Sequence, residues 1–320
     1  MKDSGRALED ALVVAVAPMA ISEEDVIFEI PKTASSYGIK PDYPLRDLSI
    51  TIKDAINKGV ELLLLPEAVL NEKHTGRFSR LIRKYSKDYL LKNGEEPRLL
   101  YVFAGVSGSP KLNSDRHRNY VAIFDSLGVI VATQEKSFRW NLTQGQIVRF
   151  GIISDYPWVT PPLMENIDAA EEICVVDLDG FGRVLNFICA DTSFNVPGDW
   201  LLTHLRTDWL HAPIMDQSVC WTFYTGGGIG PWITERAHRA ACACHGRVLV
   251  TNSVSLSHRV NRANQAHGDP RTFATCGIGI LIDGMKRELT FSHLLVDINQ
   301  GSPIMELRVW GDGWGPFPPP

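Results

Sequence analysis

A cysteine stands where an apolar, β-forming segment of the chain ends. Residues 184–188 read Val-Leu-Asn-Phe-Ile, and Cys189, Ala190 and Asp191 follow them. This run predicts a buried strand that brings a thiol to the edge of a sheet, where the ligands of open α/β sheets collect. Cysteine is also one of the most often buried residue types, so inert packing in the core is the alternative for Cys189 on this segment alone.

Two further reactive residues follow predicted strands. Glu67 comes after the apolar residues 60–65, and Lys136 comes after the strand predicted at 129–133. Each of them alone is more typical of a solvated turn. Together with the cysteine they have a chemical logic, because a thiolate attacks a carbonyl or nitrile carbon, a partly buried glutamate takes the thiol proton, and an ammonium stabilises the oxyanion. Glu67, Lys136 and Cys189 therefore predict an acyl-transfer site.

At these three points the chain resembles the carbon–nitrogen hydrolase, or nitrilase, superfamily. The matching segments are Leu-Pro-Glu at 65–67, Glu-Lys-Ser at 135–137 and Ile-Cys-Ala-Asp at 188–191, with weaker matches in the family's order at 118–120, 208–213, 235–237 and 248–252. The resemblance covers about residues 10–297. It implies an α/β fold, namely a four-layer α-β-β-α sandwich of two mixed sheets with internal two-fold pseudosymmetry.

The resemblance also implies an activity. It implies hydrolysis of a non-peptide C–N bond in a small amide, carbamoyl compound or nitrile, with Cys189 as nucleophile, Glu67 as base and Lys136 as oxyanion stabiliser. The resemblance implies that the intermediate is a covalent thioester or thioimidate on Cys189. No metal or organic cofactor is implied. Family members commonly pair, so we expect a homodimer or a larger homo-oligomer.

The chain departs from the family pattern around the expected pocket. A second glutamate usually follows the lysine by a few residues, but here Gln144 or Gln146 takes that place, depending on the gap chosen. Glutamine keeps the hydrogen-bonding shape and cannot act as a base, and Glu165 in the same long region is the alternative for this acid. Ala190 replaces a usual aromatic residue, which predicts a reshaped pocket.

Five residues are the expected substrate contacts, and the fifth of them comes from a loop. The first four are Gln144, Gln146, Ala190 and Asn252, of which the last ends the strand predicted at 248–251. Trp140 is the fifth, because it falls in or beside a loop predicted on the active face, where pocket lining and ordinary packing stay equally open.

Two other functions stay open on the sequence. A nitrilase-like scaffold that binds a ligand or partner without turning it over is consistent with glutamine in the position of the second acid. An acyltransferase would form the same thioester and pass the acyl group to an amine instead of water.

The positioning elements form one domain over residues 1–320, in two halves of similar design. Hydrophobic periodicity and turn signals predict helices at 45–58, 77–92, 200–205 and 232–245, and strands at 12–17, 60–65, 99–106, 120–124, 129–133, 173–177, 184–188, 208–212, 248–251, 276–282 and 287–296. Residues 22–43 are expected to be a loop, and 137–170 a long irregular region of functional character. We expect the tail, residues 300–320, to be extended and to contact a partner subunit.

The composition narrows the class of protein. Of the 320 residues, 44% are hydrophobic and 22% charged, and the net charge of −5 gives no indication of nucleic acid or an anionic membrane as partner. Six cysteines in a chain with so large a core are expected to be reduced thiols. No apolar run approaches the length that crosses a membrane. The sequence thus predicts a cytoplasmic protein that binds a small-molecule substrate.

Overall fold

The structure is a computed structural model in which two mixed sheets face each other. It describes residues 12–17, 19, 26–32, 36–41, 45–110, 114–178, 181–193, 198–216, 221–222, 231–244, 246–253, 255–269, 272–273, 277–283, 290–296, 305–310 and 313–316.

The first sheet has three parallel strands at its centre. Its order is β20 (Gly313–Pro316), β19 (Met305–Trp310), β1 (Leu12–Val16), β4 (Leu62–Leu64), β6 (Tyr101–Gly108), β7 (Arg118–Asp125) and β8 (Ile130–Glu135), with β5 (Leu70–Asn71) beside β6. Strands β1, β4 and β6 are parallel, whereas β19, β20, β7 and β8 join antiparallel.

The second sheet repeats this arrangement. Its order is β11 (Val176–Leu178), β12 (Gly182–Asn186), β13 (Trp209–Ile214), β15 (Arg247–Asn252), β17 (Gly277–Asp283) and β18 (Thr290–Val296). Strands β12, β13 and β15 are parallel, and β17 and β18 follow antiparallel, as β7 and β8 do in the first sheet.

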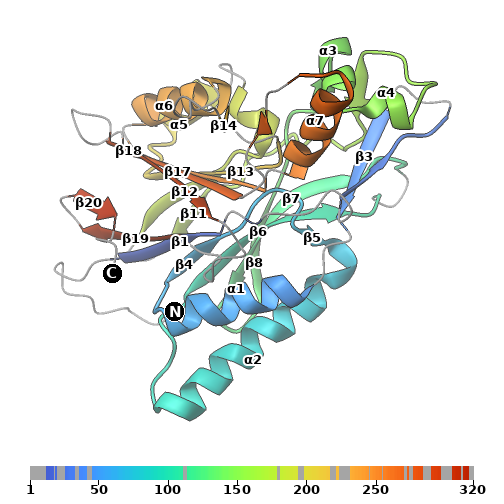
Figure 1. The fold of residues 1–320 in the computed structure, drawn as a ribbon. Coiled ribbons are helices and arrows are strands. Elements are labelled where there is room, and N and C mark those ends of the chain that lie inside the picture. The colour runs from blue at the N-terminus through green and yellow to red at the C-terminus, as the bar shows by residue number, and fades with distance from the viewer. Residues whose placement is uncertain are drawn as a thin grey trace.

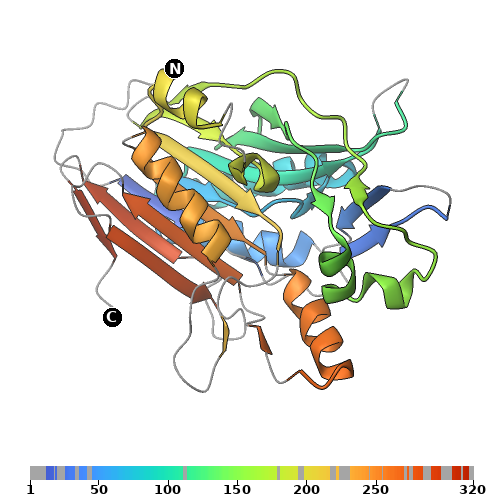
Figure 2. The same cartoon turned by 90° about the horizontal axis from the view of Figure 1, so that it is seen from above.

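The remaining strands of the described residues form two smaller sheets. One has the order β2 (Val26–Glu29), β3 (Ser36–Pro41), β10 (Leu163–Glu165) and β9 (Asn141–Leu142), and the other pairs β14 (Trp221–Thr222) with β16 (Thr272–Phe273). In both views the sheet that contains β3 lies at one end of the molecule, beside α3 (Gln144–Arg149), α4 (Ile152–Asp155) and α7 (Ser255–Ala266) (Figures 1 and 2).

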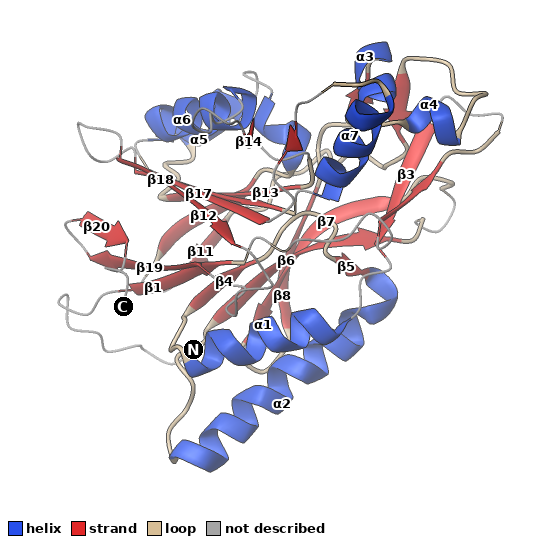
Figure 3. Cartoon of the chain, viewed as in Figure 1, coloured by secondary structure: helices blue, strands red, loops and turns tan. Residues whose placement is uncertain are grey.

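Helices cover the outer faces of the two large sheets (Figure 3). Helices α1 (Leu45–Asn57) and α2 (Thr75–Asn93) lie on the first sheet, the latter preceded by a 3-10 turn (Glu72–His74). Helices α5 (Gly198–His204) and α6 (Pro231–Cys244) lie over the second sheet. No helix among the described residues is both long enough and apolar enough to cross a membrane.

Successive side chains of the central strands point to opposite faces of the sheet, so these strands contribute to two separate hydrophobic cores. In β1, Val14 and Val16 face the core shared with the second sheet, whereas Val13 and Ala15 face the core beneath α1 and α2. Strands that are apolar on both faces are typical of a sheet buried on both sides. The first sheet is therefore the rigid centre that carries the ends of β4 and β8.

The strongly periodic elements were predicted correctly. Helix α1 ends before Gly59, and α2 ends at Gly94, and both glycines have the left-handed φ expected of a helix C-terminus, +69° and +75°. The hairpin of β11 and β12 and the extended tail are also found. The tail strand β19 pairs with β1 of its own chain, and its contact with a partner subunit stays a prediction.

Two expectations were wrong, and one helix was not predicted. Residues 22–43 contain the β2–β3 hairpin instead of a loop, and residues 137–170 contain β9, α3, α4 and β10. These short strands are stabilised by pairing with distant strands, which local periodicity does not report. The helix missed in the sequence is α7. Four of the six cysteines are described and free, at 174, 189, 242 and 244.

Candidate active site

The three reactive residues all follow strands of the large sheets. Glu67 lies three residues beyond β4, Lys136 directly after β8, and Cys189 at the start of a 3-10 turn (Cys189–Ser193) that follows β12. All three side chains are buried, with 2%, 1% and 4% of their surface exposed. Ionisable groups are rarely this buried unless they are paired, so their partners decide what they can do.

Glu67 and Lys136 form a buried ion pair. The Nζ of Lys136 donates to Oε1 of Glu67 at 2.8 Å. The same oxygen accepts a hydrogen bond from Nδ2 of Asn119 at 2.8 Å, and Oε2 accepts one from the backbone N–H of Met215 at 3.0 Å. Both carboxylate oxygens are thus held, one of them by the second sheet.

Glu165 is the second acid of the cluster. It ends β10, is 3% exposed, and its Oε2 lies 2.9 Å from Nζ of Lys136. Asn119 donates to Oε1 of Glu165 as well as to Glu67, and the backbone N–H of Trp140 donates to Oε2. Burial alone lowers the pKa of Lys136, but Glu165 and Glu67 outweigh it and raise that pKa well above its usual value. Lys136 is therefore a permanent cation between two carboxylates.

Cys189 lies within the electrostatic reach of this cluster. Its φ of +48° is left-handed, a sparsely populated conformation that turns the chain sharply from strand to 3-10 turn. Burial, and then the charge of Glu67, raise the pKa of the thiol well above its usual value, and Lys136 opposes this shift. The resting sulfur is therefore a neutral thiol that needs a base to become a nucleophile.

Asp191 ties the cysteine turn to the lysine segment. Its carboxylate accepts hydrogen bonds from the backbone N–H groups of Ser137 at 3.1 Å, Phe138 at 2.8 Å and Ile188 at 3.0 Å. Burial raises the pKa of Asp191 to about 7, against the lowering effects of Lys136 and of these three N–H groups. Asp191 fixes the segment after Lys136 against the residue that precedes Cys189.

The backbone around Glu67 is held by a close approach and by a polar chain. A Cβ on Gly105 of β6 would meet the carbonyl oxygen of Pro66 at 2.3 Å and Cα of Glu67 at 2.6 Å, so only glycine fits there. On the other side, Oγ1 of Thr251 donates to the carbonyl oxygen of Leu65 at 3.2 Å. Nε2 of the buried His211 lies 3.2 Å from the same hydroxyl.

The tautomer of His211 follows from its contact with Asn186. Nδ1 lies 3.0 Å from Oδ1 of Asn186, and because an amide oxygen only accepts, Nδ1 carries the proton and donates it. Nε2 of the neutral ring is then an acceptor that faces the hydroxyl of Thr251. Burial lowers the pKa of His211 to about 3, so the imidazole is neutral.

The structure does not bring the two expected glutamines to Lys136. Gln144 is exposed at the start of α3, and the Gln146 side chain accepts a hydrogen bond from the backbone N–H of Thr143 in a capping box. The chain leaves the site at β9 and returns through the antiparallel pairing of β9 with β10, which delivers Glu165 beside Trp140. Neither glutamine contacts Lys136, and the alternative, Glu165, is the carboxylate that does; the roles of all three toward a substrate stay predictions.

The remaining expected contacts are found at or near the cluster. Ala190 is buried directly after the cysteine. Trp140 bonds Glu165 through its backbone, and its ring packs edge-on against Tyr37 and Phe150. Asn252 is buried at the end of β15 and accepts a hydrogen bond from the backbone N–H of Asp216 at 3.1 Å. Their contact with a substrate stays a prediction.

Two residues of the cluster had no assigned role in the sequence. Asn119 was noted only as part of a family-like segment, although a polar residue at the start of an otherwise apolar strand is a signal. Tyr37 was missed because it lies in the segment expected to be a loop, and no local pattern relates it to Glu165. Its position follows from the pairing of β3 with β10.

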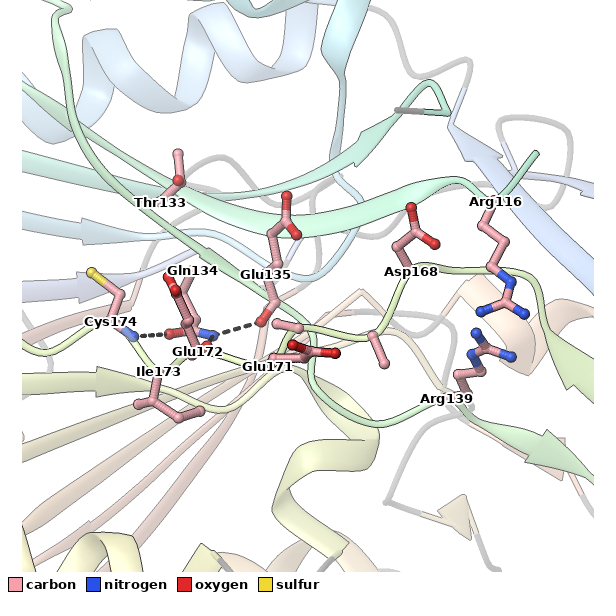
Figure 4. Close-up of a pocket in the computed structure, with 12 residues that line it drawn as sticks. Arg116, Thr133, Gln134, Glu135, Arg139, Asp168, Glu171, Glu172, Ile173 and Cys174 are labelled. Carbon is pink, nitrogen blue, oxygen red and sulfur yellow. Dashed lines mark hydrogen bonds between the residues drawn. The ribbon is translucent and has the colours of Figure 1, made fainter. Parts of the chain in front are cut away.

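A surface pocket of about 980 Å³ is lined by the end of β8 and by residues 168–174, together with two arginines (Figure 4). Arg116 and Arg139 point toward each other at one end of it, and Gln134 bonds the backbone of Glu135, Glu172 and Cys174 at the other. None of the residues that line this pocket belongs to the cluster of Glu67, Lys136, Glu165 and Cys189. It is a separate feature of the surface.

Comparison with known proteins gives a fold. No family model matches the chain, and no curated protein matches it. Among solved structures, Nit3 of Saccharomyces cerevisiae, a member of branch 10 of the nitrilase superfamily, has a TM-score of 0.51 at 14% identity, over 91% of this chain and 93% of its own. The NitFhit protein of C. elegans has a TM-score of 0.54 at 16% identity, over 90% of this chain and 61% of its own.

A third similar structure is a mutant amidase from Nesterenkonia sp. AN1 that carries the acetamide moiety of fluoroacetamide on its active site cysteine. Its TM-score is 0.52 at 9% identity, over 90% of this chain and 91% of its own. At such identities the likeness concerns the fold. The chain has the fold of the carbon–nitrogen hydrolase, or nitrilase, superfamily.

Proposed function

We propose that the protein is a cysteine-dependent hydrolase that cleaves a non-peptide C–N bond in a small amide, carbamoyl compound or nitrile. The observation that carries this proposal is the ammonium of Lys136 held between two buried carboxylates, with the buried Cys189 on a turn that Asp191 fixes against the segment after Lys136. Removing these charges from water is costly, and a hydrophobic core of the same shape would often be as stable. Such clusters of perturbed groups are typical of functional sites.

We infer the chemistry from the residue types of the site. Glu67 takes the proton of the Cys189 thiol, and the sulfur attacks the carbonyl carbon while the carbonyl electrons move to oxygen. Lys136 stabilises the resulting oxyanion, and Glu165 fixes the position of that ammonium. When the C–N bond breaks, the proton held by Glu67 passes to the leaving nitrogen, which departs as ammonia or an amine.

A second half-reaction restores the enzyme. Glu67 takes a proton from water, and the hydroxide attacks the thioester. The acid is released, and the sulfur recovers its proton from Glu67. These three side chains supply nucleophile, base and cation, so the proposed steps balance with no further reactant than water.

The contacts of Glu165 bear on one of the two alternative functions, the non-catalytic scaffold, and not on the acyltransferase. The non-catalytic scaffold was motivated by glutamine in place of the second acid, and the contact of Glu165 with Lys136 removes that motive. An acyltransferase would use the same residues and differ only in the acceptor of the acyl group.

The proposal has three further parts, of which the fold supports the first. The repeated strand order of the two large sheets supports the four-layer α-β-β-α sandwich with two-fold pseudosymmetry. We also propose a homodimer, and a cytoplasmic location consistent with the free cysteines of the described residues.

Ammonia release from a panel of small primary amides, carbamoyl compounds and nitriles tests the proposed function. Cys189→Ala should abolish turnover of every accepted substrate, whereas Cys174→Ala, which removes another free thiol, should leave it unchanged. Assays with and without hydroxylamine separate the two transfer reactions, because a hydrolase releases free acid in water alone, whereas an acyltransferase turns over only when the amine is added. Turnover that survives Cys189→Ala would refute the proposed function.

A further inference from the structure

Tyr37 lies beside Glu165 in the small sheet. Strands β3 and β10 are parallel, and Tyr37 is the direct partner of Glu165 in their register. Side chains at paired positions of adjacent strands point to the same face of a sheet. The β2–β3 hairpin therefore places the phenol on the face from which Glu165 reaches Lys136.

The Tyr37 hydroxyl is buried with little bonding. The residue is 0% exposed, and among the described residues its one hydrogen bond is a long one, 3.4 Å to the carbonyl oxygen of Trp140. That carbonyl oxygen already accepts the backbone N–H of Glu165 at 2.8 Å. A hydroxyl has one proton to donate and two lone pairs that accept, so the acceptor capacity of this oxygen is unused by the described residues.

The phenol is neutral. Burial, followed by the charges of Glu165, Cys189 and Glu67, raises the pKa of Tyr37 well above its usual value of 10.0. It is therefore neither a base nor a nucleophile at ordinary pH. The register that pairs Tyr37 with Glu165 places it beside the carboxylate that contacts Lys136.

Packing does not account for the oxygen. The Tyr37 ring lies near Phe28, with centroids 6.1 Å apart, and edge-on to Trp140 at 6.4 Å. Phenylalanine would keep these contacts, whereas a buried hydroxyl with a poor hydrogen bond is costly. A ligand that donates a hydrogen bond would repay that cost.

An amide substrate brings such a donor. In the proposed reaction its carbonyl oxygen faces Lys136, and Glu67 acts as the base, so an amide N–H needs another acceptor. We propose that Tyr37 contacts the substrate, and that its hydroxyl oxygen accepts an N–H of the substrate amide and makes the site selective for amides over analogues without an N–H. This inference rests on the proposed function and assigns a specificity residue to it.

Two alkylating reagents test this selectivity at Cys189. Iodoacetamide and methyl iodoacetate both alkylate sulfur through their CH₂ carbon, with loss of iodide and of the thiol proton. Only the amide carries an N–H. Tyr37→Phe should slow the alkylation of Cys189 by iodoacetamide about five- to tenfold, as expected for one lost hydrogen bond, and change the methyl iodoacetate rate less than about twofold. Tyr156→Phe, which removes a hydroxyl that donates to the Phe28 carbonyl, should change neither rate.

The wild-type protein gives a second measurement that depends on no variant. The ratio of the two rates at Cys189 should exceed the ratio at Cys174 in the same sample about fivefold, by the same hydrogen bond. Equal ratios at the two cysteines, or an equal loss of both rates in Tyr37→Phe, would overturn the role of Tyr37.

The outcomes separate this inference from the proposed function. If Cys189 reacts with both reagents and shows no preference for the amide, only the role of Tyr37 fails. If Cys189 of the wild type reacts with neither reagent, the proposed nucleophile is wrong and the role of Tyr37 fails with it.

Discussion

The Nζ of Lys136 lies 2.9 Å from Oε2 of Glu165, a residue that β10 brings back to the site from well beyond the lysine along the chain. Because Nζ also donates to Glu67, one ammonium is shared by two carboxylates, and Asn119 donates to both. Lys136, Asn119 and the two glutamates thus form a single hydrogen-bonded unit, and we expect the loss of any one of them to change the position of the others.

The first prediction compares the removal of the glutamate at position 165 with the introduction of a glutamate at position 146. Glu165→Gln should lower kcat/KM about 10- to 100-fold, the effect of one lost hydrogen bond to a charged group, because Lys136 loses its second carboxylate. Gln146→Glu should change kcat/KM less than about twofold, since glutamate also fits the capping box of α3. Activity that rises in Gln146→Glu would instead favour Gln146 as the position of the second acid.

The second prediction concerns the base. Glu67→Gln should lower kcat about 10²- to 10⁴-fold, the usual range for general acid–base catalysis, because the neutral thiol of Cys189 then has no proton acceptor. Glu72→Gln is a matched control, since Glu72 pairs with Arg118 away from the cluster. Steady-state ammonia release measures both, and equal activities in the two variants would exclude Glu67 as base.

The third prediction uses the close approach at Gly105. Gly105→Ala should destabilise the fold by about 1–3 kcal/mol and displace Glu67, because the new methyl overlaps the backbone of residues 66–68. Gly76→Ala, where a Cβ meets nothing within 4 Å, should stabilise α2 by up to about 1 kcal/mol. Urea unfolding measures the two changes, and a neutral Gly105→Ala would contradict the packing described at Glu67.

The fourth prediction concerns pH and His211. The folded-state pKa of about 3 lies below the unfolded value of about 6.5, so the unfolded chain binds more protons between these values. This contribution to stability is complete above the unfolded pKa and is lost as the pH falls through the window. Between pH 7.5 and 5.5 the loss should be about 1.4 kcal/mol.

The variant His211→Gln isolates the contribution of His211 to the pH dependence of the free energy of unfolding. It removes the titrating group, so the free energy of unfolding of the wild type should fall by about 1.4 kcal/mol more than that of the variant over the same interval. The difference is read from urea unfolding at the two pH values. Parallel pH profiles for the two proteins would show that His211 keeps its proton affinity on folding.

Most elements of the two large sheets and their helices could be predicted, because the sequence patterns that indicate each element lie within a single segment. The apolar run at 60–65, the periodicity of α1 and the glycine ends of α1 and α2 each identify an element within one segment. The same logic, together with the family resemblance, put Glu67, Lys136 and Cys189 at strand ends, where the structure has them. Their catalytic roles stay predictions.

The small sheet could not be predicted in this way. Strand β3 is stabilised by β10, which lies far away in the chain, so nothing around Tyr37 indicates its neighbour Glu165. One local signal was present and unused. Thr143 followed by Gln146 is a capping-box pattern, which would have assigned Gln146 to the start of α3.

A covalent bond between substrate and Cys189 is the most direct test of the proposed site. After rapid acid quenching with an accepted amide, mass spectrometry of the proteolytic peptides should find the acyl mass on the peptide that contains Cys189. The adduct should be absent in Cys189→Ala and strongly reduced in Glu67→Gln, because the neutral thiol of that variant has no proton acceptor. Ammonia release with no acyl mass on Cys189, or with the mass on another cysteine, would contradict the assignment of Cys189 as nucleophile.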